Sequence, residues 1–474
     1  MSSVNLELAF SPSQLKSYFE EAIRDSAGRG IDGINGLAFS NNLDDKLSVI
    51  SKKIKSRRYR FSPYLEVVKS KGRGKTPRII SKPVVKDKLV LYAIKEELHK
   101  LFPECIPNKL PNTYIRDIKE KFRVLDCDNT SYLKVDIKGF YDNLTREAIL
   151  EKVGNASKNE NFISLIKRSL INKTVPKGYR KKDSKKYTTD KGVPQGLSIS
   201  NILAEIYMED FDKFFKTRGL GYYRYVDDIL IFAENSEIDQ IELEIKEQFE
   251  IIDLSIHDQD QEDKKSEKGS VKEHFQYLGY KVSSEKVTVK ESTVNRYIES
   301  LISMFTKFKH GAKYQVSDSK FLKMDSVKEI FILELNDKIT GALSDNKKYG
   351  WMFYFIEIDD IYLLHKIDGI IKKQFERLEL FSKKAPENRT RDNELGVCSL
   401  VRTYYEIKYN LLGNYVHNYS KYDSRSDKLS YLVKFGLIAH YDGKTYTDDE
   451  INQKFFAAKK SKLLKLELDV GKIS

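Results

Sequence analysis

Three aspartates, Asp136, Asp227 and Asp228, have the residue type and spacing for metal-dependent chemistry. Phosphoryl transfer through two divalent ions needs acidic oxygens that hold the ions roughly 3.5–4 Å apart. The backbone carbonyl of Ile137 can complete the shell of one ion. Two Mg²⁺ ions, or Mn²⁺ in their place, suit such an all-oxygen site. The sequence therefore predicts a phosphoryl-transfer site with Asp136, Ile137, Asp227 and Asp228 as metal ligands.

An Asp-Asp pair by itself is weak support for this site, because the sequence contains four such pairs. The pair Asp359-Asp360 also has apolar flanks. Its surroundings, from Trp351 to Phe375, favour one long helix, and no strand-ending aspartate precedes it at short range. The β-rich flanks of Asp227-Asp228 therefore distinguish this pair from the others.

The elements around the aspartates must bring them together. The run 131–135 is rich in β-favouring residues and predicts a strand that ends at Asp136. The runs 222–225 and 229–232 predict a tight hairpin with Asp227 at its tip. A hairpin beside the strand can bring Asp227 next to Asp136, whereas the carboxylate that follows points in another direction.

Other segments predict a mixed fold. Runs 64–68 and 78–80 predict a second hairpin, joined by a turn rich in glycine and lysine at 71–75. Apolar residues recur at helical spacing over 198–215, which predicts a helix. Beyond about residue 292 the pattern is mostly helical.

Positive charge is abundant and clustered in this chain, which has 474 residues and a net charge of +13. The clusters lie at 52–60, 69–78, 177–186 and 459–465. Clustered positive charge is expected of a protein that binds a phosphate backbone. Solvated basic faces explain the same pattern equally well, so the charge suggests a nucleic-acid partner without establishing one.

No segment indicates secretion, a membrane span or a disulfide framework. No apolar run approaches the ~18–20 residues that cross a bilayer, and the N-terminus lacks the pattern of a signal peptide. The three cysteines lie far apart with no CxxC pair, so we expect neither disulfides nor a zinc site. The sequence predicts a cytoplasmic protein with no membrane partner.

Three motifs resemble those of bacterial reverse transcriptases, including group II intron, retron and defence-associated enzymes. They are Leu133–Asp142, Gly192–Ser198 and Tyr225–Asp228, and they occur in family order, followed by the similar Phe275–Tyr280. The resemblance covers roughly residues 28–290. It implies an α+β right-hand polymerase, with fingers and palm built from an antiparallel sheet plus helices, followed by an all-helical thumb and C-terminal domain.

The resemblance implies three parts in chain order. Residues 1–130 are an N-terminal extension and fingers, 131–290 are the palm, and 291–474 are a helical thumb and C-terminal domain. The last part contains no endonuclease pattern of cysteines and histidines. This combination favours the defence-associated, abortive-infection type over a group II intron maturase.

The resemblance also implies roles for individual residues. Asp136, Asp227 and Asp228 resemble the catalytic carboxylates of the palm. Tyr141 resembles the steric gate that stacks under the sugar and excludes a 2′-hydroxyl, although an ordinary core aromatic is the alternative. Gln195 resembles the residue that lines the nucleotide pocket, beside a glycine that permits close backbone approach.

Two residues of the basic hairpin, Lys69 and Arg78, resemble the fingers residues that bind the triphosphate. Arginine suits a bidentate phosphate contact, and lysine acts as a point charge. Three other lysines compete for the lysine role: Lys71, Lys75 and Lys82.

Two further features remain open. Lys264, Lys265 and Lys268 are equal candidates for the lysine that donates a proton to pyrophosphate. The stretch 402–409 mixes basic and aromatic residues. It can stack on RNA, or it can be ordinary core with a solvated basic edge.

The sequence thus predicts an RNA-directed DNA polymerase that joins deoxynucleotides on an RNA template and acts in bacterial anti-phage defence. The template can be a cognate non-coding RNA, the product is DNA, and a homo-oligomer is a further expectation. Two alternatives stay open: untemplated or protein-primed DNA synthesis by the same site, and a catalytically silent RNA-binding scaffold.

Overall fold

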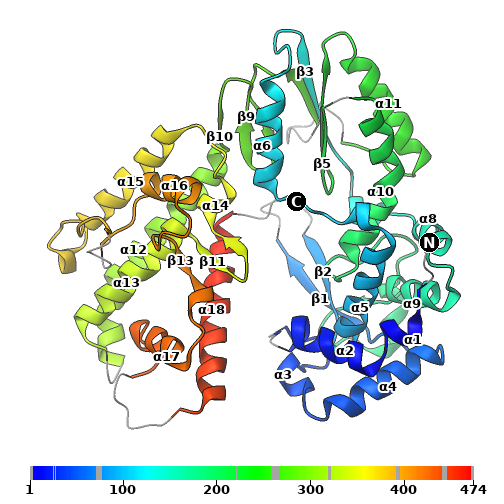
Figure 1. The fold of residues 1–474 in the computed structure, drawn as a ribbon, viewed down its shortest axis with the longest axis horizontal. Coiled ribbons are helices and arrows are strands. Elements are labelled where there is room, and N and C mark those ends of the chain that lie inside the picture. The colour runs from blue at the N-terminus through cyan, green and yellow to red at the C-terminus, as the bar shows by residue number, and fades with distance from the viewer. Residues whose placement is uncertain are drawn as a thin grey trace. The chain divides into compact units, whose positions relative to one another are not determined.

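The computed structural model describes residues 4–24, 26, 28–70, 77–219, 221–257, 266–318, 322–390, 396–439 and 446–470. The chain forms two compact units (Figure 1). Unit 1 comprises Met1–Lys109 and Asn129–Gly269, and unit 2 comprises Leu110–Asp128 and Ser270–Ser474. The boundaries of fingers, palm and thumb near residues 130 and 290 stay a prediction.

Unit 1 mixes helices with two small sheets, as the sequence predicts. Its α-helices are α1 (Leu6–Ala9), α2 (Pro12–Tyr18), α3 (Gly36–Phe39), α4 (Leu43–Lys55), α5 (Val85–Leu101), α7 (Phe140–Asn143), α8 (Arg146–Ser157), α9 (Glu160–Leu170), α10 (Ser200–Thr217) and α11 (Ile238–Ile251). Short π or 3₁₀ turns are η1 (Phe19–Ile23), η2 (Pro103–Cys105) and η3 (Lys181–Tyr187). Its strands are β1 (Tyr64–Lys69), β2 (Arg78–Lys82), β3 (Thr130–Asp136), β4 (Thr174–Val175), β5 (Gly221–Tyr225), β6 (Asp228–Glu234) and β7 (Glu267–Ser270).

The larger sheet of unit 1 has the strand order β5-β6-β3-β7. Strand β6 pairs in antiparallel fashion with β3 on one side and β5 on the other, so the predicted strand and the predicted hairpin form one sheet. Helix α10 buries Ile202, Leu203, Ile206 and Phe211, which confirms the helical spacing in the sequence. Strands β3, β5 and β6 and helices α10 and α11 share one apolar core.

The smaller sheet of unit 1 has the order β2-β1-β4. Strands β1 and β2 form the predicted basic hairpin, with Lys69 opposite Arg78 at the end next to the connecting turn. The predicted turn at 71–75 lies outside the described residues. Within unit 1, the N-terminal helices α1 to α4 (blue in Figure 1) gather at the end that holds this hairpin and α5, away from β3, β5 and α11.

Unit 2 is mostly helical. Its α-helices are α6 (Pro111–Phe122), α12 (Glu291–Asp318), α13 (Met324–Thr340), α14 (Trp351–Tyr354), α15 (Ile361–Phe375), α16 (Leu400–Tyr409), α17 (Arg425–Lys434) and α18 (Asp448–Val470), with 3₁₀ turns η4 (Glu379–Phe381) and η5 (Tyr419–Lys421). Its strands are β8 (Phe275–Tyr277), β9 (Tyr280–Val282), β10 (Val287–Val289), β11 (Ala342–Ser344), β12 (Lys347–Tyr349) and β13 (His417–Asn418). No helix among the described residues is long and apolar enough to span a membrane.

The prediction that the C-terminal part is all helical is wrong. Strands β11, β12 and β13 form a small sheet within it. The β11–β12 hairpin turns at Asp345 and Asn346, whose φ angles are +50° and +61°. Two consecutive positive φ angles match the twist of a two-residue hairpin, and Asp and Asn tolerate them better than other non-glycine residues.

The prediction of one helix from Trp351 to Phe375 is also wrong, because the chain breaks between α14 and α15. The break contains Asp359, whose carboxylate accepts a hydrogen bond from the backbone N–H of Val287 and forms an ion pair with Lys119. Asp360 is the N-cap residue of α15. This Asp-Asp pair therefore has structural partners.

Candidate active site

Asp136 and Asp228 lie opposite each other in the larger sheet of unit 1. They are the last residue pair of the antiparallel β3–β6 ladder. The turn before β6 carries Asp227, and its backbone carbonyl accepts a hydrogen bond of 3.2 Å from the N–H of Ile137. The strand end and the hairpin tip are thus hydrogen-bonded directly, and the three aspartates are neighbours.

The hairpin turn itself has an unusual backbone. Tyr225 pairs with Asp228, so only Val226 and Asp227 lie in the loop. Val226 has a φ angle of +59°, a left-handed conformation that is costly for a β-branched residue. Arg224 donates a hydrogen bond of 3.0 Å to the Val226 carbonyl, which helps to hold this conformation.

The carboxylates repel one another electrostatically. The pKa of Asp228 is raised to about 7, chiefly by burial, and the charges of Asp136 and Asp227 raise it further. The buried Lys134, two residues before Asp136 on β3, lowers it. Adjacent anions in a partly buried place are the environment that a divalent cation stabilises.

The predicted metal ligands fit hard cations by their donor type, since carboxylates and a backbone carbonyl supply only oxygen. Among the residues that the structure describes, no group of three or more His, Cys, Asp or Glu side chains is already arranged to hold an ion. Substrate phosphates supply part of the metal shell in two-metal sites. The role of Asp136, Ile137, Asp227 and Asp228 as ligands stays a prediction.

A histidine that the sequence reasoning did not select lies beside Asp136. His257 Nε2 is 3.6 Å from Asp136 Oδ2, and the backbone N–H of His257 donates to the Asp136 carbonyl. The contact exists because Ile256 forms a bridge with Ile137. Nothing in the local sequence pattern indicates this long-range pairing.

Of the three lysines that are candidate proton donors, only Lys268 lies within the described residues. Lys264 and Lys265 lie outside the described residues. Lys268 forms ion pairs with Asp239 and Glu242 of α11, at 2.5 and 2.8 Å. Its ammonium group is thus engaged by that helix.

Tyr141 and Gln195 lie on two segments that are hydrogen-bonded to each other. The N–H of Val193 donates to the Tyr141 carbonyl at 2.7 Å, and Gln195 Nε2 is 3.4 Å from Asp142 Oδ1. The Tyr141 hydroxyl contacts Asn201 Oδ1 at 3.3 Å. The half-buried Tyr141 ring packs against the core instead of being enclosed by it.

Arg78 is close enough to Tyr141 to influence its ionisation. Burial raises the pKa of Tyr141, the charges of Glu205 and Asp227 raise it further, and the charge of Arg78 lowers it. Lys69 lies opposite Arg78 at the end of the β1–β2 hairpin and is exposed. The β1–β2 pairing therefore places Lys69 and Arg78, the predicted triphosphate-binding residues, opposite each other. The charge of Arg78 acts on Tyr141, the predicted sugar gate.

The basic hairpin contacts the Gln195 segment through the backbone. The N–H of Ser81 donates to the Gln195 carbonyl at 2.7 Å. Gly196 has a φ angle of +98°, and a Cβ atom there would be 2.5 Å from Ile80 Cγ2. The close backbone approach expected at this glycine is thus an approach to strand β2. The competing Lys71 and Lys75 lie outside the described residues.

One known protein family matches this part of the chain. A family model described as "Reverse transcriptase (RNA-dependent DNA polymerase)" matches residues 68–282, which include all three aspartates. Residues 68–282 are a reverse transcriptase domain.

Curated relatives of this domain are distant. The chain is 27% identical over 179 residues to the "Uncharacterized 91 kDa protein in cob intron" of Schizosaccharomyces pombe, covering 36% of this chain and 21% of that protein. It is 25% identical over 179 residues to the "Group II intron-encoded protein LtrA" of Lactococcus lactis subsp. cremoris, covering 36% of this chain and 28% of that protein. The chain thus spans under a third of the length of either relative.

A solved telomerase from Candida albicans in complex with a fragment of telomeric RNA is 14% identical, with a TM-score of 0.41. The match covers 74% of this chain and 68% of that one.

Two buried arginines of the reverse transcriptase domain were not selected from the sequence. Arg146 donates hydrogen bonds to the carbonyls of Gly192, Thr189 and Lys191, at 2.8, 2.6 and 3.0 Å. It thereby supports the segment that leads into Gln195. The sequence does not indicate this role, because hydrogen bonds from a buried arginine to backbone carbonyls require no particular residue types at the partner positions.

The second arginine, Arg224, binds helix α10. Its Nη2 atom is 2.6 Å from carboxylate oxygens of both Glu205 and Asp212. The Tyr222 hydroxyl donates to the same Asp212. The seven-residue spacing of Glu205 and Asp212 on one helix face is a signal that could have suggested a shared cationic partner.

Proposed function

We propose that this protein is an RNA-directed DNA polymerase that adds deoxynucleotides by two-metal phosphoryl transfer. The observation that carries the proposal is the pairing of Asp136 with Asp228 at the end of β3, next to a turn that holds Asp227. Asp136, Asp227 and the Ile137 carbonyl would hold the ions, with Asp228 as the auxiliary carboxylate. When bound, the ions would activate the primer hydroxyl and neutralise the triphosphate.

The other predicted residues would bind and select the nucleotide. Arg78 and Lys69 would contact the triphosphate, the first through its planar guanidinium and the second as a point charge. The Tyr141 ring would lie under the sugar and exclude a 2′-hydroxyl by steric contact. Gln195 would line the pocket beside Gly196.

The test is incorporation of radiolabelled dTTP on a poly(rA) template with an oligo(dT) primer. We expect Asp227→Ala combined with Asp228→Ala to reduce incorporation by about a thousandfold or more, since loss of metal ligands removes several kcal/mol of transition-state stabilisation. Asp44→Ala combined with Asp45→Ala is the matched control. It removes another Asp-Asp pair, from the first turn of α4. Equal activity of the two double variants would exclude the proposal.

The same assay separates the proposed reaction from its alternatives. A product that copies the added RNA supports templated synthesis, whereas a homopolymer or a random sequence indicates untemplated synthesis. Product that stays covalently attached to protein after nuclease digestion indicates a protein primer. A separate measurement in cells tests the scaffold alternative, which full biological activity of the double aspartate variant would support.

We also propose a cytoplasmic role in bacterial defence against phage, with a cognate non-coding RNA as template, DNA as product and a homo-oligomer as the working form. Support comes from the resemblance to defence-associated enzymes and from the mostly helical region that extends from α12 to α18. The test is the efficiency of phage plating on cells that carry the wild-type gene or the double aspartate variant. Equal plating efficiency on the two strains would refute the defence role. It would not bear on the polymerase activity, which the incorporation assay tests separately.

A further inference from the structure

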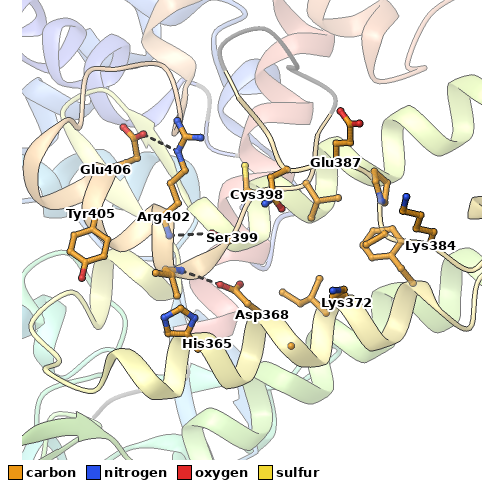
Figure 2. A pocket seen from close by; sticks show the side chains of 18 of the residues that line it. His365, Asp368, Lys372, Lys384, Glu387, Cys398, Ser399, Arg402, Tyr405 and Glu406 are labelled. Carbon is orange, nitrogen blue, oxygen red and sulfur yellow. Dashed lines mark hydrogen bonds and ion pairs between the residues drawn. The ribbon is translucent and has the colours of Figure 1, made fainter.

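Unit 2 contains a cavity of about 990 Å³ that no step of the proposed polymerase reaction uses. It lies between helices α15 and α16 and the segments 384–388 and 397–399. Figure 2 shows side chains from both helices pointing into it. Its volume is in the range of small-molecule and cofactor sites.

One end of the cavity is aromatic. Tyr405 and Tyr409 are one turn apart on α16, and their rings are nearly parallel, with an interplanar angle of 18° and centroids 6.4 Å apart. They are 47% and 80% exposed. The neighbouring Tyr404 is buried and donates to the Ile358 carbonyl. Of the aromatic residues in this stretch, Tyr405 and Tyr409 are therefore the pair that offers flat faces to a ligand.

Two lysines lie at the other end of the cavity (Figure 2). Lys372 of α15 and Lys384 both line it and are exposed. Figure 2 shows them on the side of the cavity opposite Tyr405 and Arg402. No ion pair joins either lysine to an acidic side chain within the part of the chain that the structure describes.

Two of the acidic side chains that line the cavity have partners in the protein. Asp368 accepts hydrogen bonds from the backbone N–H groups of Leu400 and Val401 at the start of α16. Glu406 pairs with Arg402 at 3.1 Å. A third carboxylate, that of Glu387, also lines the cavity and contributes negative charge.

A glycine in the middle of α15 also lines the cavity. A Cβ atom on Gly369 would meet no atom within 4 Å. Glycine inside a helix destabilises it relative to alanine, and here no packing contact within the described chain requires the small residue. Open space at a helical glycine matches the close approach of a ligand to the backbone.

We propose that this cavity binds a nucleoside phosphate, as a free nucleotide or as one unit of a single-stranded RNA. The base stacks on Tyr405 and Tyr409, the phosphate lies by Lys372 and Lys384, and the ligand passes over Gly369. Aromatic faces at one end and exposed ammonium groups at the other match the two ends of a nucleotide. The site is in unit 2 and does not depend on the polymerase reaction.

The test is photolabelling of the full-length protein with 8-azidoadenosine monophosphate, followed by peptide mapping. We expect label on the α16 peptide. Unlabelled AMP that suppresses this label indicates a free-nucleotide site. Suppression by single-stranded oligoadenylate RNA but not by AMP indicates a unit of RNA, and both results support the proposal.

Variants test each end of the site. Tyr405→Ala with Tyr409→Ala should reduce α16 labelling at least about fivefold, the lower range for loss of one base stack. Lys372→Ala with Lys384→Ala should weaken it in a salt-dependent way. Gly369→Leu keeps all four side chains and places a new side chain in the open space beside α15, so it should also reduce the label. The matched controls are Tyr362→Ala and Lys373→Ala, exposed residues of α15 that do not line the cavity.

The proposal fails if label appears only on unit 1 peptides. It also fails if label on α16 persists in both the tyrosine variant and Gly369→Leu, or if the two control variants lose it equally. Because Tyr405 and Tyr409 are exposed, the melting temperature of their variant should match that of the wild type, which separates loss of binding from loss of folding.

Discussion

Arg224 at the end of strand β5 forms an ion pair with Asp212 of helix α10, with Nη2 and Oδ2 2.6 Å apart. A second ion pair joins Arg224 to Glu205, and the same guanidinium donates to the Val226 carbonyl. The Arg224 side chain is only 4% exposed. Through this contact the helix supports the left-handed Val226 in the turn that carries Asp227.

Arg224→Lys should lower polymerase turnover more than nucleotide affinity. A lysine cannot bind two carboxylates and a carbonyl through a planar fork, so the turn before Asp227 loses its support. We expect kcat to fall about tenfold or more with a smaller change in KM for dTTP. Arg224→Met should lower the free energy of unfolding by about 3–5 kcal/mol, since it leaves buried carboxylates without their cation.

Arg218→Lys is the matched control for that experiment, because Arg218 forms an exposed ion pair with Glu244 just after α10. Exposed pairs contribute less than about 1 kcal/mol. Steady-state kinetics and chemical denaturation of the variants supply both measurements. Wild-type turnover in Arg224→Lys would contradict a positioning role.

Gly196→Ala should disrupt the contact between the Gln195 segment and strand β2. The alanine would hold a positive φ angle, which costs about 1–2 kcal/mol, and its Cβ atom would overlap Ile80. Gly178→Ala tests the backbone cost alone, because Gly178 has a φ angle of +83° and no atom near its Cβ direction. Denaturation and incorporation assays should show a larger loss of stability and of activity for Gly196→Ala than for Gly178→Ala. Equal losses in the two variants would show that the contact with Ile80 is unimportant.

Tyr141→Ala should admit ribonucleotides. Removing the ring removes the steric contact with a 2′-hydroxyl, so we expect the preference for dTTP over UTP to fall by about tenfold or more, or 1.4 kcal/mol. Tyr141→Phe keeps the ring and loses only the hydroxyl contact with Asn201, so its preference should stay near that of the wild type. A preference unchanged in Tyr141→Ala would assign the ring to the core instead.

Asp87 should make the free energy of unfolding fall as pH rises from about 4 to about 6. Burial raises the pKa of Asp87 to about 6, although the Tyr59 hydroxyl and the Ser62 N–H favour its charged form. The folded state therefore binds the proton more tightly than the unfolded state, and this stabilisation is lost as pH rises through the folded pKa. The full effect is about 3 kcal/mol, for a shift of roughly two pKa units.

Denaturant titrations at a series of pH values would measure this slope. Asp87→Asn should remove it, whereas Asp44→Asn, at an exposed position, should leave it unchanged. The same slope in Asp87→Asn and the wild type would assign the pH dependence to other groups.

The local elements of the candidate site were predictable because each has a short-range pattern. The β-rich run before Asp136, the two runs around Asp227 and the helical spacing of α10 appear at the predicted positions. Short-range patterns do not predict the β11–β12 hairpin, because its Asp345-Asn346 turn lies among helical patterns. They also do not predict the break in the helical pattern at Asp359, because its partners Val287 and Lys119 are distant in the sequence.

Sequence alone determined the residue types of the site, the order of its motifs and the family to which residues 68–282 belong. Tertiary structure decided which residues meet. The pairing of Asp136 with Asp228, the support of the turn by Arg224 and the cavity beside Tyr405 and Tyr409 all join residues on different elements. Such contacts depend on strand register and side-chain packing, which the periodicity of a single segment does not encode.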